Sequence, residues 1–306
     1  MEAIEESLIL PGQREGELRR GGRYFRDALF ALVLRAIAFG STALVLGVIL
    51  IIIIKGASAI SIEFLTSPPT DGMTAGGIYP MIRGSLLLLF GTFIIVLPVG
   101  VLGGIFLAEY AGHGVFGRVM HACIASLAGT PSVIYGLFGL AVFVVIMMEM
   151  GVSLLAGCLT LALFALPPIV FTTENAIRSV PETFIEAGMA LGLSRSQVLR
   201  KIVLPHALPG ILTGLILSSG RAAGETPPIL LTAGIYYASG ELAKGWQMLK
   251  QPVANLPYHL AEGYRQGGVI PEVIVWGTCL ILTTLVLSIN LGAIVIRLWT
   301  RRKQRW

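Results

Sequence analysis

The stretch EAGMALGLSRSQVLRKIVLP, Glu186 to Pro205, is a charged segment set between long apolar runs. Just before it, Pro181 fits the first turn of a helix, and Glu182 lies where the helix dipole favours an acidic side chain. Gly192 predicts the end of this helix, because glycine readily adopts the left-handed conformation that a helix C-terminus favours. The sequence therefore predicts a short helix that stops at a glycine turn.

A second short helix is predicted directly after the glycine. Ser194 and Gln197 have the spacing of a capping box, in which each side chain satisfies a backbone N–H at the start of a helix. Arg200 and Lys201 suit a last helical turn, and we expect the helix to end at Pro205. The stretch thus predicts a helical hairpin.

The hairpin resembles the EAA loop of ABC importer permeases, which reads Glu-Ala-Ala, three residues, Gly, nine residues, Ile-x-Leu-Pro. The matching residues are Glu186, Ala187, Gly192, Ile202, Leu204 and Pro205. Gly188 replaces the second alanine, which exchanges one small residue for another. The resemblance implies a coupling element that docks into a groove of a separate ATPase. An ordinary amphipathic hairpin between two membrane helices is the alternative.

The composition is that of a membrane protein. Of the 306 residues, 55% are hydrophobic and 13% are charged, which is too apolar for a soluble domain of this length. The three cysteines, Cys123, Cys158 and Cys279, lie in apolar runs without a CxxC pair, so we expect no metal site, disulfide framework or cofactor.

Six segments are long and apolar enough to cross a bilayer, which takes about 20 residues each. They are residues 29–54, 84–108, 122–148, 151–171, 207–233 and 272–296. The sequence therefore predicts an all-α membrane protein, with a permease domain of six transmembrane helices at 29–296 and a hairpin loop at about 174–206. Residues 1–28 and 297–306 are predicted to be polar tails.

Basic residues predict the orientation. They are concentrated in the tail 1–28, the loop 174–206 and the tail 297–306, and they are sparse in the loops on the other side. By the positive-inside rule both termini and the hairpin are cytoplasmic. The net charge of +5 thus comes from basic residues that orient the protein in the membrane and lie next to membrane lipid. It does not indicate nucleic-acid binding.

Glycine and proline interrupt several spans. In the third, Gly129-Thr130-Pro131-Ser132 predicts a break, which a bilayer tolerates where neighbours or a watery cavity satisfy the backbone. We therefore include Thr130 and Ser132 among the candidate pathway residues. The pairs Gly100/Gly104 and Gly210/Gly214 predict close helix contacts without identifying the partner helix.

The fifth span carries a polar stripe. At 100° per residue, one narrow face holds Gly210, Gly214, Ser218, Arg221 and Glu225. Charges at membrane depth usually face a bundle interior or an aqueous cavity. The arginine fork suits an oxyanion, and an acid four residues on can pair with it. The stripe thus predicts either a substrate pathway or a structural ion pair.

The same region narrows the resemblance. GRAAGETPPILLTAG at residues 220–234 resembles the span-five signature of the phosphate-specific (Pst) permeases of the A type. Three further stretches resemble that family: GGIYPMIRGS (76–85), FLAEYAG (106–112) and LAGTPSVIYGLFGL (127–140). The resemblance implies the fold of type I ABC importer permeases. It also implies a C-type (PstC-type) partner permease, a dimer of PstB-type ATP-binding subunits and an extracytoplasmic PstS-type phosphate-binding protein, in a bacterial plasma (inner) membrane.

The expected function is therefore a non-catalytic permease subunit of an ATP-driven phosphate importer. The chain has no GxxxxGK[ST] loop for nucleotide phosphates, so we expect a partner subunit to hydrolyse ATP. Two alternatives remain: a permease for another oxyanion such as sulfate, molybdate or phosphonate, and a membrane scaffold that signals phosphate status. Whether the partner permease is a homologue or a second copy also stays open.

Overall fold

The computed structural model describes residues 11–112, 114–147, 151–235, 245–265 and 270–303. The ends of both predicted tails, 1–10 and 304–306, lie outside the described residues. The chain divides into two units, residues 1–54 and 55–306, which are described separately. The first unit consists of most of helix α2 (Pro11–Gly56), whose residues from Ala28 onward contain an 18-residue window with a mean hydropathy of 2.8 and suit the predicted first span.

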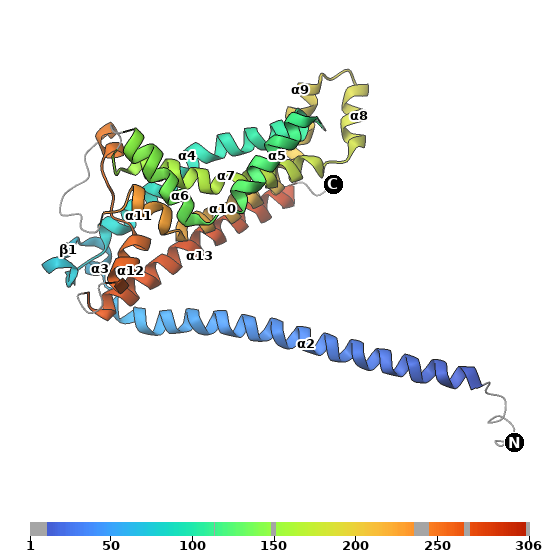
Figure 1. Ribbon diagram of the computed structural model, residues 1–306, viewed down its shortest axis with the longest axis horizontal. Helices are drawn as coiled ribbons and strands as arrows, with labels where there is room; N and C mark the ends of the chain where they lie inside the picture. Colours follow the sequence, from blue (N-terminus) through green and yellow to red (C-terminus); the bar gives the residue numbers. More distant parts are fainter. Residues whose placement is uncertain (1–10, 113, 148–150, 236–244, 266–269, 304–306) are drawn as a thin grey trace. The chain divides into compact units, whose positions relative to one another are not determined.

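The second unit is almost entirely helical (Figure 1). Its α-helices are α3 (Ile62–Thr66), α4 (Tyr79–Glu109), α5 (Val115–Ala128), α6 (Ser132–Gly139), α7 (Leu154–Arg178), α8 (Glu182–Ala190), α9 (Arg195–Val198), α10 (Leu204–Gly224), α11 (Pro227–Thr232), α12 (Leu256–Arg265) and α13 (Glu272–Lys303). Leu140–Ile146 and Leu199–Val203 are π-helical, and Ala57–Ala59, Asp71–Met73 and Gly245–Lys250 form 3₁₀ turns. A small antiparallel pair joins β1 (Pro69–Thr70) to β2 (Ala75–Gly76).

Helix α7 is the centre of this unit, and α4 and α10 pack along it through glycines. A Cβ at any of these glycines would collide with an α7 side chain, so the two helices approach α7 closely. The facing pairs are Gly100–Ile169, Gly104–Thr173, Gly210–Ala176 and Gly214–Thr172. The predicted close contacts are confirmed, and the partner helix, which the sequence left open, is α7 in both cases.

The third span is not one continuous helix. It consists of α5 followed by α6 and its π-helical extension, and the two parts are bent by 102°. The bend falls at Gly129–Pro131, as the break in the sequence predicts. The hydroxyl of Tyr135 donates a 2.7 Å hydrogen bond across it to the Leu127 carbonyl. Within the described residues there are thus five candidate spans, or six if the bent pair counts as one.

The connection from α2 to α4 and the connection from α11 to α13, named the outer connections because they lie away from the α8–α9 end, share a core of their own. Phe64, Met73 and Ile78 from the first connection pack with Leu256 and Ile270 from the second. This cluster lies at the opposite end of the second unit from α8 and α9 (Figure 1). The unit therefore has a hairpin end and an outer end, with α7 running from one to the other.

Candidate functional site

The α8–α9 hairpin, Glu182–Val198, has the turn that the sequence predicts. Gly192 has a φ of +81°, in the left-handed region. Its N–H donates to the Met189 carbonyl, and the N–H of Leu193 donates to the Gly188 carbonyl. These two bonds satisfy the free carbonyls at the end of α8 and define a Schellman motif. A Cβ at Gly192 would meet nothing within 4 Å, so backbone conformation alone favours glycine there.

The start of α9 is confirmed as a capping box. The Ser194 hydroxyl accepts from the N–H of Gln197, and the Gln197 side chain accepts from the N–H of Ser194 at 2.8 Å. Gly188 is buried, and a Cβ there would approach Ile202 to 2.7 Å. The glycine that replaces the second alanine of the motif therefore lets α8 lie close against the following helical segment.

The predicted end of the second helix at Pro205 is wrong. The helix continues from Arg195 through Pro205 to Gly224 and forms one candidate span of 30 residues. Pro205 has no N–H to donate, and the π-helical turn Leu199–Val203 just before it changes the hydrogen-bond spacing so that the Leu204 N–H reaches the Leu199 carbonyl. The second helix of the hairpin is thus continuous with the fifth span, and the motif residues Leu204 and Pro205 begin α10.

Side-chain contacts attach the hairpin to the end of α4. The Arg195 guanidinium donates to the Glu109 carbonyl at 2.9 Å, lies 3.5 Å from the Glu109 carboxylate and is near the ring of Tyr110. A cavity of about 230 Å³ between hairpin and α4 is lined in part by Glu109, Met189 and Arg195. These contacts connect the hairpin to α4, in addition to its continuity with α10.

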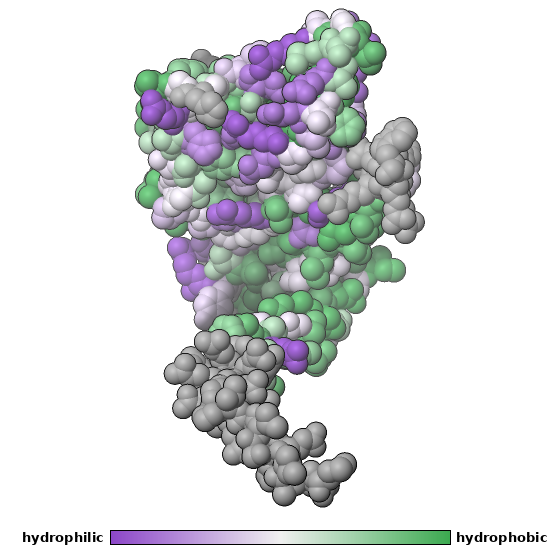
Figure 2. Space-filling view, turned by 90° about the vertical axis from the view of Figure 1, so that its right-hand side faces the viewer, coloured by the Kyte–Doolittle hydropathy of each residue, from purple (hydrophilic) through white to green (hydrophobic). Residues whose placement is uncertain are grey.

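The hairpin presents an apolar tip to its surroundings. Phe184, Met189 and Leu191 are 47%, 50% and 83% exposed, and the motif residues Glu186 and Ala187 are exposed on α8. Figure 2, in which this end lies uppermost, shows hydrophobic side chains among hydrophilic ones there. Exposed apolar groups rimmed by polar groups are typical of a protein-docking surface.

A buried carboxylate that sequence reasoning missed lies at the base of the hairpin. Glu174 is 5% exposed, accepts from Arg178 at 3.0 Å and lies 3.6 Å from His121 on α5. Arg178 also donates to the Leu107 carbonyl on α4 at 3.2 Å. These bonds join α4, α5 and α7 just before the hairpin. The sequence predicted the fourth span to end at residue 171, so Glu174 and Arg178 fell in the predicted loop, and only their four-residue spacing hinted at a pair on one helix face.

The polar stripe of the fifth span is only partly confirmed. Gly210, Gly214 and Ser218 face the bundle, but α10 ends at Gly224, and Glu225 has extended backbone angles. Pro227 and Pro228 explain the end, because neither can donate to the carbonyl four residues back. Glu225 therefore does not continue the helical face.

Of the two alternatives for the stripe, the structural ion pair between Arg221 and Glu225 is not formed in this structure. No ion pair joins these two side chains, both of which the structure describes. Arg221 instead lies over the ring of Phe164 on α7, 4.7 Å from its centroid, and is exposed. Phe164 in turn packs edge-on against Tyr135. Neither aromatic residue was a sequence candidate, although Tyr135 falls within one of the stretches that resemble the Pst family.

The breaks in the third and fifth spans lie against each other. Gly136 on α6 faces the Pro227 carbonyl, so closely that a Cβ would approach it to 2.6 Å. Thr130 at the first break donates to the Ser126 carbonyl, and Ser132 begins α6. Arg221 contacts Phe164, Phe164 contacts Tyr135, and Tyr135 is bonded to Leu127 beside the break in the third span. Arg221 is thus connected to that break through two aromatic side chains. Ser218 is 1% exposed, and its hydroxyl has no partner among the described residues.

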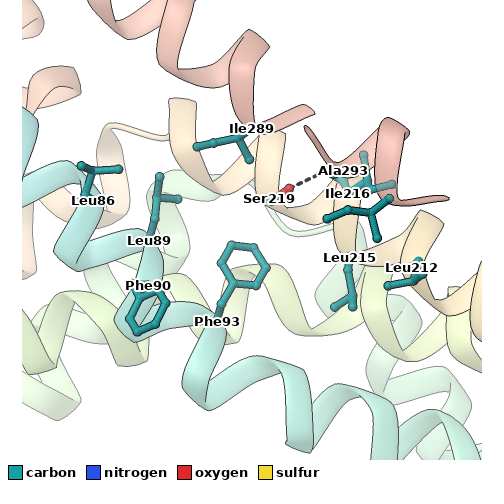
Figure 3. A pocket seen from close by; sticks show the side chains of 11 residues that line it. Leu86, Leu89, Phe90, Phe93, Leu212, Leu215, Ile216, Ser219, Ile289 and Ala293 are labelled. Carbon is teal, nitrogen blue, oxygen red and sulfur yellow. Dashed lines mark hydrogen bonds between the residues drawn. The ribbon is translucent and has the colours of Figure 1, made fainter. Parts of the chain in front are cut away.

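A separate cavity of about 400 Å³ between α4, α10 and α13 does not suit an anion (Figure 3). Its walls are leucine, isoleucine and phenylalanine side chains, apart from Ala293 and Ser219. The Ser219 hydroxyl donates to the Ile216 carbonyl of its own helix at 2.8 Å. Hydrocarbon chains suit such walls, whereas a desolvated oxyanion would lack donors.

Comparison with known proteins identifies the family. The profile described as binding-protein-dependent transport system inner membrane component matches residues 100–305. The chain belongs to this family. It is therefore a multi-span membrane permease subunit of a binding-protein-dependent transport system.

Individual relatives agree with this assignment. The chain is 37% identical over 270 residues to YqgI of Bacillus subtilis, a probable ABC transporter permease protein. This match covers 83% of this chain and 91% of YqgI. It is 31% identical over 271 residues to the probable phosphate transport system permease protein PstA of Methanocaldococcus jannaschii, with coverage of 87% and 92%. PstA of Yersinia pestis is 33% identical over 245 residues, with coverage of 79% and 80%.

Solved structures share the fold. An inward-facing MetNI methionine ABC transporter matches with a TM-score of 0.56 and 22% identity, over 73% of this chain and 94% of that one. A bacterial alginate ABC transporter matches with a TM-score of 0.64 and 15% identity, over 94% and 100%. The expected all-α fold of an ABC importer permease is confirmed.

Proposed function

We propose that this permease subunit carries inorganic phosphate into the cell. Its similarity to PstA proteins over about four fifths of its length carries the proposal. Arg221 supports it chemically: a guanidinium can form bidentate, charge-assisted hydrogen bonds with phosphate, and this one lies exposed beside two adjoining span breaks.

The α8–α9 hairpin is the coupling element in this proposal. It lies in the cytoplasm with both termini, as the distribution of basic residues suggests. Its exposed apolar tip docks on a dimer of PstB-type ATP-binding subunits, which hydrolyse ATP, so this chain is non-catalytic. A PstC-type permease completes the pathway, and an extracytoplasmic PstS-type protein delivers phosphate to a bacterial plasma membrane.

ATP-driven displacement of the hairpin would move two helices together. Because the hairpin is continuous with α10 and bonded to the end of α4, it moves both against α7, on which they pack through glycines. Relative motion of such helices around a fixed site is how alternating access operates in many transporters.

The discriminating experiment is uptake with competing oxyanions. A strain that lacks its own phosphate importer is given this chain with its neighbouring transport subunits, and uptake of radiolabelled phosphate is measured. We expect uptake that excess phosphate suppresses and that sulfate, molybdate and phosphonate leave unchanged. Suppression by one of those anions at least as strong as that by phosphate would instead support the other-oxyanion permease, and assembly without any uptake would support a signalling scaffold.

A further inference from the structure

A second large cavity lies at the outer end of the second unit, remote from the α8–α9 hairpin. Its volume is about 690 Å³, and its walls come from α12, from the first turns of α13 and from the segment that links α10 to α11. Unlike the apolar cavity of Figure 3, it contains both charged and apolar side chains. Its chemistry is therefore that of a site for an amphipathic molecule.

One positive and one negative side chain line this cavity. The Lys55 ammonium lies 4.7 Å from the centroid of the Trp276 ring. Glu272, one helical turn before Trp276, belongs to the first turn of α13. Residues four apart lie on the same helix face, so the carboxylate and the ammonium share one side of the cavity. Neither charge has an ion-pair partner among the described residues.

The remaining walls have the composition expected at the boundary between membrane and water. Leu260, Val275 and Leu282 are apolar, whereas Trp276 and the largely exposed Tyr264 are residue types that favour the boundary between membrane and water. From these residue types we infer that the charges lie near headgroup level and that the apolar wall extends along α13 toward the hydrocarbon core. A free phosphate ion would leave that apolar wall without a partner.

We propose that this cavity binds an aminophospholipid, such as phosphatidylethanolamine, of the leaflet remote from the hairpin. The lipid phosphate contacts the Lys55 ammonium, the lipid ammonium contacts the Glu272 carboxylate, and an acyl chain covers the apolar wall. This arrangement pairs both charges at once, which matters because unpaired charges are costly where water is scarce. The site is independent of the identity of the transported anion.

The site also contacts the end of α10, one of the helices that move in the proposed mechanism. Gly224 and Thr226, which flank Glu225 where α10 ends, both line the cavity. A bound lipid therefore packs against the backbone on either side of this break, one turn beyond Arg221.

Lipid retention tests the proposal directly. The complete transporter is placed in nanodiscs of phosphatidylcholine, alone or mixed with phosphatidylethanolamine or phosphatidylglycerol, and the lipids released with it are identified by native mass spectrometry. We expect retained phosphatidylethanolamine, and its loss in Lys55→Gln and in Glu272→Gln. Arg297→Gln and Glu63→Gln, which remove matched charges outside the cavity, should retain it. Equal retention in all four variants, or none in the unaltered protein, would overturn the proposal.

Cys279 offers a second readout, because it lines the cavity. In a protein with Cys123→Ala and Cys158→Ala, alkylation of Cys279 by N-ethylmaleimide should slow severalfold when phosphatidylethanolamine is present. Phosphatidylglycerol, or inorganic phosphate added to phosphatidylcholine nanodiscs, should leave the rate unchanged. A rate that is the same in every lipid contradicts the proposal: if uniformly low, another protein subunit fills the cavity, and if uniformly high, nothing does.

Discussion

The conformation of Gly192 decides whether the α8–α9 hairpin can form. Because its φ is +81° and no atom obstructs a side chain, replacement acts through the backbone alone. A left-handed conformation costs an ordinary L-residue about 1–2 kcal/mol, and more when the side chain is β-branched. We expect Gly192→Val to assemble in the membrane but to lose phosphate uptake and stimulated ATP turnover.

Asparagine is the matched control at this position, because it tolerates the left-handed region better than other side chains. Gly192→Asn should keep most of the uptake that Gly192→Val loses. Normal uptake and ATP turnover by the valine variant would contradict the proposal that the turn at Gly192 couples ATP hydrolysis to transport.

His259 makes the outer end sensitive to acid. Its side chain on α12 is 3% exposed, neither ring nitrogen has a partner among the described residues, and burial lowers its pKa to about 4. In the unfolded chain the pKa of His259 is about 6.5, so between about pH 6.5 and pH 4 the unfolded chain binds more protons than the folded protein. The free energy of unfolding therefore falls as the pH falls through this window. From pH 8 to pH 5 the loss is about 2 kcal/mol.

Thermal unfolding of the solubilised chain at pH 8 and pH 5 measures this effect. His259→Phe keeps a flat, apolar-compatible ring but cannot be protonated, so we expect its unfolding temperature to change less between the two pH values. An equal change in both proteins would show that groups other than His259 account for the acid sensitivity.

At the level of elements, local patterns predicted local structure well. The capping box of Ser194 and the left-handed turn at Gly192 depend on neighbouring residues, and both are confirmed. Sequence alone also located the break near Thr130, but not its angle of 102°, because the packing of α6 against α11 and α7 determines that angle.

Two errors have a common cause. Pro205 was predicted to end a helix, and Glu225 was predicted to continue one, yet the structure reverses both expectations. A single proline can be accommodated by a π-helical turn, whereas two consecutive prolines remove adjacent donors and end the helix. Arg221 interacts with Phe164, a contact between two helices that no spacing within one helix could predict.

The separation of Arg221 from Glu225 makes a prediction about the fifth span. If the two charges do not pair, then removing both should be no milder than removing the arginine alone. We expect Arg221→Gln and the Arg221→Gln/Glu225→Gln double variant to lose about tenfold or more of their phosphate uptake, the effect of about 1.4 kcal/mol. Uptake is normalised to assembled complex, and Arg221→Lys tests the loss of the bidentate fork. Near-normal uptake in the double variant would contradict a pathway role for Arg221 and would favour a structural ion pair between Arg221 and Glu225.

At the scale of the molecule, α7 separates two ends of different chemistry. Its N-terminal residue Leu154 is bonded to Gln251 of the outer connection, and its C-terminal residue Arg178 lies beside the α8–α9 hairpin. Since α7 is a candidate span of 25 residues, the hairpin and the outer connection belong on opposite sides of the membrane.

Cysteine accessibility tests this topology. Single cysteines at Ser194 in the hairpin and at the 86% exposed Trp246 in the outer connection are introduced into a protein without native cysteines. An impermeant thiol reagent added to intact cells should label only the cysteine at position 246, and the one at position 194 should react after the cells are opened. Labelling of both in intact cells would contradict the arrangement of spans.

The most direct measurement is transport by the purified complex. This subunit, its partner permease and the ATP-binding subunits are reconstituted in proteoliposomes, with the extracytoplasmic binding protein, and accumulation of radiolabelled phosphate is followed. We predict accumulation that requires both ATP and the binding protein, that fails with Arg221→Gln, and that sulfate and molybdate do not suppress. ATP hydrolysis that is stimulated by a different anion, together with accumulation of that anion instead of phosphate, would contradict the assignment.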